Sequence, residues 1–137
     1  MDKALNYLAL ARKGGRAELG EEPVGGAARA GKAYAILVAS DASDHTWRRA
    51  KSYAAGTDQQ CVRLPYTKDE MGFAIGRQEL AIAAITDVAL ALALVQALPN
   101  PQQYAEAVQN LSEKAKRQAQ RKKESQAHKR NVAKGKK

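Results

Sequence analysis

Two glycine-led turns hold the residues best suited to bind an anion. The first opens at Gly20 and continues through Glu21, Glu22 and Pro23, a composition typical of a helix start. The second is the run 76–79. A helix start offers free backbone N–H groups, and glycine lets a phosphate or a base edge come close to the chain. If both turns meet at one end of a sheet, the resulting surface suits a folded RNA more than a DNA groove.

Residue types that catalyse reactions are sparse and scattered. Cys61 and His45 are the obvious thiol and imidazole of the domain, but Cys61 lies within an apolar strand, where cysteine is usually a small buried hydrophobe. Glu21 and Glu22 are helix neighbours that point about 100° apart, so they form no facing acid–base pair. No cysteine, histidine or acidic residues have the clustering of metal ligands. We therefore expect no catalytic residue, no cofactor, no metal and no enzymatic activity.

Positive charge is concentrated at the C-terminal end of the chain. Residues 1–112 carry 12 basic and 12 acidic residues, whereas residues 113–137 carry 11 basic and 2 acidic residues, which accounts for the net charge of +9. Such a segment raises affinity for any nucleic acid without reading its sequence, although a merely solubilising tail is the alternative. The tail residues expected to bind RNA non-specifically are Lys122, Lys123, Lys129 and Arg130.

Helical and strand patterns alternate along most of the chain. Hydrophobic periodicity and capping residues predict helices at 2–12, 21–30, 44–55, 68–75 and 88–98, and strands at 16–19, 33–39, 60–64 and 80–85. The strand at 80–85 is wholly apolar, so we expect it to be central. The alternation predicts an α/β fold, a three-layer α/β/α sandwich with a small mixed sheet of about four strands.

Pro99 and Pro101 end this domain, and the chain beyond them changes character. Tyr104, Val108 and Leu111 form a narrow apolar stripe on an otherwise polar helix, which we expect to pack back on the domain, with docking of a protein partner as the alternative. After residue 115 no apolar periodicity remains, so we expect disorder or a fraying helix. The predicted units are an RNA-binding domain at 1–98, a linker and amphipathic helix at 99–115, and a basic tail at 116–137.

Compartment and membrane association follow from other features. The N-terminus lacks the basic start and apolar stretch of a signal peptide, and a single cysteine suits a reducing compartment. The most apolar stretch, 80–98, is interrupted by Thr86 and Asp87, and an acidic residue in the middle of a membrane span is costly. We expect a cytoplasmic protein that does not enter a membrane.

Four sequence blocks resemble a known family. In order and spacing, the blocks 8–15, 20–24, 40–46 and 71–77, the last followed by 83–87, resemble the YlxQ-type bacterial members of the kink-turn RNA-binding ribosomal protein family. The resemblance spans about two thirds of the chain. It implies an α/β/α sandwich that grips the sharply bent internal loop of an RNA kink-turn.

The resemblance also implies roles for individual residues. Gly20 matches the family's turn glycine, and Glu21 and Glu22 match residues that face the bases at the sheared G·A pairs. The second contact loop, which covers flipped-out bases, matches Gly76, Arg77 and Gln78. Lys13 and Arg16 would flank the phosphate backbone. The chain departs from the family at Gly26, where a lysine or arginine is usual and which stands beside a second glycine, Gly25. It also departs at Pro23, where the family usually has a polar or apolar helix former.

The leading hypothesis is a non-enzymatic protein that binds structured, kink-turn-like RNA of ribosomal or regulatory origin, without DNA specificity. One alternative is a protein-interaction module on the same fold, whose RNA affinity comes only from the basic tail. A second is the substrate-binding domain of an RNA-modifying enzyme, standing alone or acting in trans.

Overall fold

A single four-stranded sheet organises the molecule. The computed structural model describes residues 2–135, with side chains described to residue 126. The strand order is β1-β4-β2-β3, with β2 parallel to β3 and the other two pairings antiparallel. The strands are β1 (Ala17–Leu19), β2 (Ala35–Val38), β3 (Gln60–Arg63) and β4 (Ile82–Ile85). The predicted central position of β4 is confirmed, since β2 and β4 are the two inner strands.

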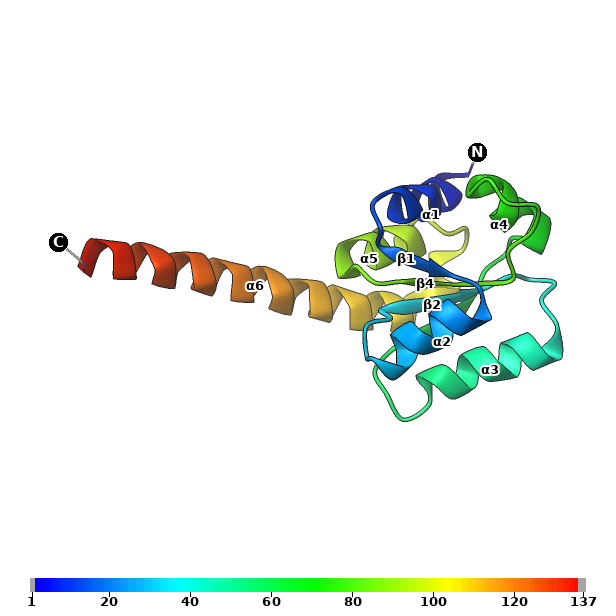
Figure 1. Ribbon diagram of the computed structural model, residues 1–137, viewed down its shortest axis with the longest axis horizontal. Helices are drawn as coiled ribbons and strands as arrows, with labels where there is room; N and C mark the ends of the chain where they lie inside the picture. Colours follow the sequence, from blue (N-terminus) through cyan, green and yellow to red (C-terminus); the bar gives the residue numbers. More distant parts are fainter. Residues whose placement is uncertain (1, 136–137) are drawn as a thin grey trace.

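Helices cover both faces of this sheet (Figure 1). On one side lie α1 (Lys3–Lys13), α4 (Lys68–Ala74) and α5 (Val88–Gln96), and on the other lie α2 (Glu21–Arg29) and α3 (Asp44–Ala54). The predicted three-layer α/β/α sandwich is therefore confirmed. None of the helices described between residues 2 and 135 combines the length and the apolar character that crossing a membrane requires.

The residues at the helix starts explain the element boundaries. The side chains of Asp2, Ser43 and Asp87 accept hydrogen bonds from first-turn backbone N–H groups of α1, α3 and α5. Thr67 and Glu70 form a reciprocal capping box at α4. Every residue of β2 and β4 is buried, and many of these are alanine or valine, so helices approach the sheet closely from both sides.

The C-terminal segment differs from its prediction. A short 3₁₀ turn, η1 (Pro101–Tyr104), leads into one helix, α6 (Ala105–Gly135), so the described part of the segment predicted to be disordered or a fraying helix, residues 116–135, is helical. The physical reason lies in composition, because from residue 102 to residue 134 the chain has no proline or glycine and is rich in lysine, glutamine, alanine and arginine, which favour helix. Figure 1 shows α6 projecting away from the domain.

The first turns of α6 belong to the domain core. Leu111 is fully buried and Ala107 is nearly so, while Tyr104 and Val108 are partly buried against the same core. The apolar stripe thus packs back on the domain. Leu111 has no exposed surface, so the docking of a protein partner through Tyr104, Val108 and Leu111 together does not fit this arrangement.

Candidate functional site

The two glycine-led turns lie at the same end of the sheet. Because β1 is antiparallel to β4, Leu19 is paired with Ala83, and the backbone N–H of Gly20 donates to the carbonyl of Ile82 over 3.0 Å. The turn that begins at Gly76 leads directly into β4. In Figure 1, α2 starts at this end of the sheet, and α6 leaves from the opposite end.

Gly20 has a conformation that fits only glycine. Its φ of 95° and ψ of 164° place it in a region that side chains exclude, and it forms the N-cap of α2 without a side-chain hydrogen bond. Glu21 and Glu22 occupy the first helical turn, where acidic residues complement the helix dipole. The chain therefore turns sharply between β1 and α2, and the residue at this turn carries no side chain.

Glu21 and Glu22 have different roles in the structure. The Oε1 of Glu21 accepts from Thr46 Oγ1 over 3.0 Å, and its Oε2 accepts from Arg49 Nη1 over 3.0 Å, so both oxygens are held by α3. Glu22 is exposed, and the described side chains form no hydrogen bond with it. Glu22 is thus the acidic side chain available to a ligand, while Glu21 fixes α2 against α3.

The second turn is held directly against the backbone of α4. The N–H of Arg77 donates to the carbonyl of Gly72 over 2.9 Å, and the N–H of Leu80 donates to that of Lys68 over 3.0 Å. A Cβ on Gly72 would lie 2.6 Å from the Cα of Glu79. Arg77 and Gln78 are consequently fixed at the backbone with exposed side chains. Sequence reasoning gave Gly72 no role, although a glycine inside a seven-residue helix was a usable signal.

The structure therefore places six of the eight residues that the sequence predicts for the domain's RNA-binding site at one end of the sheet. We call this set the two-turn surface. It consists of Gly20, Glu21, Glu22, Gly76, Arg77 and Gln78.

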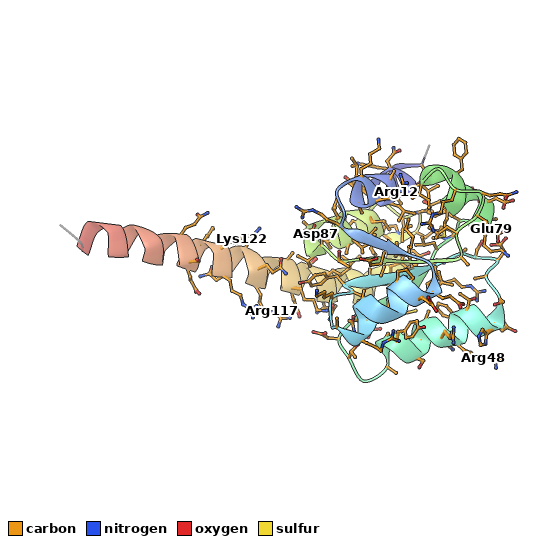
Figure 2. The ribbon with its side chains drawn as sticks, viewed as in Figure 1. Arg12, Arg48, Glu79, Asp87, Arg117 and Lys122 are labelled. Atoms are coloured by element: carbon orange, nitrogen blue, oxygen red, sulfur yellow. The ribbon has the colours of Figure 1, made fainter. Side chains whose placement is uncertain are left out.

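Lys13 and Arg16 lie elsewhere. Arg16 precedes β1, where its carbonyl accepts from the N–H of Thr86 and its Nη1 pairs with Asp87 Oδ1 over 2.6 Å. Lys13 is the last residue of α1. Figure 2 shows Asp87 and Glu79 at opposite ends of β4, so β1 and β4 separate Arg16 from the two-turn surface. A ligand that contacts all eight residues would have to extend past the domain edge.

The glycine pair does not break α2, which runs without interruption from Glu21 to Arg29. Gly25 is buried, and a Cβ there would lie 3.0 Å from the hydroxyl of Tyr53, so this glycine lets α2 approach α3 closely. Gly26 is exposed and faces open space. It follows Glu22 by four residues, which places both on one helix face.

Other residues considered for chemistry are accounted for by packing. Burial raises the pKa of the Cys61 thiol from 9.0 to about 11, so this cysteine stays protonated and unreactive at neutral pH. Trp47 is half-buried, and its ring carries Lys51 and Arg63 at 5.5 and 5.3 Å from the centroid. Among the described side chains, no three histidine, cysteine or acidic residues are grouped as metal ligands would be.

The predicted tail residues fall into two groups. Lys122 and Lys123 are exposed on α6, and Figure 2 shows Lys122 well outside the body of the domain. Lys129 and Arg130 lie in the helical backbone of α6 but outside the residues whose side chains the structure describes.

Comparison with known proteins gives structural likenesses and no sequence family. No protein-family model matches the chain, and neither does a curated protein sequence. A protein of unknown function from Bacillus halodurans is similar in structure, with a TM-score of 0.61 and 27% identity over 71% of this chain and 97% of that one. A Giardia lamblia 15.5 kD RNA-binding protein superposes with a TM-score of 0.54 and 18% identity, over 76% of this chain and 86% of that one.

Proposed function

We propose that this chain is a non-enzymatic RNA-binding protein that recognises structured, kink-turn-like RNA of ribosomal or regulatory origin through the two-turn surface. The observation that carries the proposal is the position of the Gly20 helix start and the Gly76 turn at the same end of the sheet. The resemblance to the kink-turn-binding family and the structural likeness to a Giardia RNA-binding protein support it.

Each part of the two-turn surface supplies a different contact. The start of α2 presents backbone N–H groups and a dipole that attract a phosphate, and Gly20 leaves room for close approach. The exposed carboxylate of Glu22 accepts hydrogen bonds from base amino groups. Arg77 adds a guanidinium that can bind phosphate in a bidentate way, and Gln78 adds both a donor and an acceptor. The protein distinguishes the bent shape of the RNA because the two turns hold these groups at a fixed separation.

Titration of a fluorescent kink-turn RNA against a matched duplex that lacks the bulge tests the proposal, using the full chain at low and moderate salt. We expect the kink-turn to bind at least about 10-fold more tightly, and the preference to persist as salt weakens both complexes. Arg77→Ala should reduce the preference, whereas Arg12→Ala, which removes the same charge from α1, should not. Equal affinity for both RNAs would contradict shape recognition and leave the basic helix as the only binder.

Restoring the family's cation in α2 gives a gain-of-function prediction. Gly26→Lys places an ammonium group on the same helix face as Glu22, into open space, and removes a helix glycine that costs about 1 kcal/mol relative to alanine. One added phosphate contact should tighten kink-turn binding about 10-fold and steepen the salt dependence by about one unit. Ala89→Lys, which adds the same charge on α5, is the control. A similar gain from both variants would place Gly26 outside the interface.

A further inference from the structure

A polar cleft lies where α6 leaves the domain, at the end opposite the two-turn surface. Its volume is about 230 Å³, and the sheet end contributes Tyr34, Asp58 and Gln59 to its lining. From α6 come Lys114, Arg117, Gln118 and Arg121. In Figure 2, Arg117 lies at the start of the projecting part of α6, on the side of the molecule away from Glu79. None of the residues of the two-turn surface lines this cleft.

Two contacts fix α6 at the cleft. Lys114 has a side chain only 11% exposed, and its Nζ donates to the carbonyl of Asp58 over 2.6 Å and pairs with Asp58 Oδ2 at 3.5 Å. Gln118 Nε2 donates to Tyr34 Oη over 2.6 Å. These contacts come from two successive turns, so they set both the rotation and the height of α6 against the sheet. The cleft therefore has a defined geometry, unlike a freely moving basic tail.

The charges left over in the cleft are two guanidinium groups. Lys114 and Asp58 neutralise each other, and no described carboxylate pairs with Arg117 or Arg121. These two arginines are four residues apart and lie on one helix face, with Lys114. A guanidinium binds phosphate through two parallel hydrogen bonds, and two held side by side match the oxygens of a phosphate group. A net charge of two beside a polar hollow favours an anion over an apolar ligand.

We propose that this cleft binds a phosphodiester of the RNA backbone and is a second, localised RNA contact. The proposal rests on the proposed function, and it adds a fixed site at the far end of the domain to the two-turn surface. An RNA stem leaving the two-turn surface past the domain edge would reach the cleft formed by α6. The first part of α6 then binds RNA at a site of fixed geometry. Lys122 and Lys123, which lie beyond it, add only non-specific electrostatic attraction to RNA.

A pair of charge-matched variants of the full chain tests the cleft. Arg117→Ala with Arg121→Ala removes two charges that line it. Lys116→Ala with Lys123→Ala removes two charges that face away from the cleft, since these residues lie about 140° to 200° around the helix from Lys114 and Arg121. All four side chains are exposed and none forms a described ion pair. We therefore expect unchanged thermal unfolding for both variants.

Each variant is titrated with two kink-turn RNAs, one with short stems and one with an extended stem. We expect the cleft variant to lose about 10-fold in affinity for the extended RNA and the control variant to lose about two- to threefold, with both losing similarly small amounts for the short RNA. Equal losses for the extended RNA would overturn the cleft and leave α6 as a non-specific basic helix. Failure of the unsubstituted chain to distinguish kink-turn from duplex would instead count against the proposed function, so the two failures are distinguishable.

Discussion

Replacing Gly72 with alanine is expected to lower the free energy of unfolding by about 2 kcal/mol and to weaken kink-turn binding about 10-fold. The added Cβ would stand 2.6 Å from the Cα of Glu79, 2.7 Å from its nitrogen and 2.9 Å from the carbonyl oxygen of Arg77. All three are backbone atoms, so no flexible side chain can move aside. The turn that carries Arg77 and Gln78 must shift away from α4.

The size of this effect follows from two opposing terms. Overpacking against a fixed neighbour costs about 3 kcal/mol, and the higher helix propensity of alanine returns about 1 kcal/mol. The shift also breaks the 2.9 Å hydrogen bond from Arg77 N–H to Gly72. Because the two-turn surface depends on the separation of its two turns, the loss of RNA affinity should exceed the loss for a typical exposed residue.

Gly26→Ala is the matched control for this substitution. Gly26 also lies inside a helix, but a Cβ there meets nothing within 4 Å. Alanine should therefore raise the free energy of unfolding by about 0.4–1 kcal/mol. Urea unfolding of both variants and RNA titration measure the two effects. If Gly72→Ala is as stable as the unsubstituted chain and binds RNA equally well, the turn is not held by its contact with α4.

The local elements of this fold are readable from the sequence, because their signals are local. Apolar periods of two and 3.6 residues, with Ser43, Thr67 and Asp87 as caps, give every strand and helix up to residue 98 with only small differences at the ends. The central position of β4 follows from its wholly apolar composition.

Strand pairing sets the parts of the site that sequence reasoning missed. The family resemblance implies that Lys13 and Arg16 flank the phosphate backbone of the RNA that Gly20 contacts. The antiparallel register of β1 with β4 instead places Arg16 beside Asp87 and Gly20 beside Ile82. A three-residue strand is enough to separate the groups, and register depends on partners distant in sequence.

Contacts between distant segments explain the other omissions. The enclosure of the cleft by Lys114 and Asp58 joins residues 56 positions apart, and the fit of Gly72 against Glu79 depends on how the turn after α4 folds back on that helix. The length of α6 was underestimated for a different reason. Apolar periodicity in the sequence predicts an ordered helix only as far as residue 115. A chain rich in lysine, glutamine and alanine can nevertheless be helical without an apolar face once its first turns are anchored.

Replacing Leu111 with alanine is expected to lower the free energy of unfolding by about 3 kcal/mol, which corresponds to a fall in Tm of about 10 °C for a chain of this size. Leu111 has no exposed surface and is the largest fully buried side chain that α6 contributes to the core. The cavity left by truncation lies between α6 and the rest of the core, so collapse can be only partial. Burial of Leu111 therefore contributes strongly to holding α6 on the domain, beside the contacts of Lys114 and Gln118.

The same contact determines how the basic helix can act on RNA. Because Leu111 lies only three residues before Lys114 and six before Arg117, loosening it should release the cleft as well as destabilise the fold. Leu10→Ala, at a leucine 54% exposed on α1, is the control and should change Tm by only a few degrees at most. Calorimetry at equal protein concentration measures both variants. If the Tm of Leu111→Ala equals that of Leu10→Ala, α6 is an independent appendage, and a fixed cleft at its base could not exist.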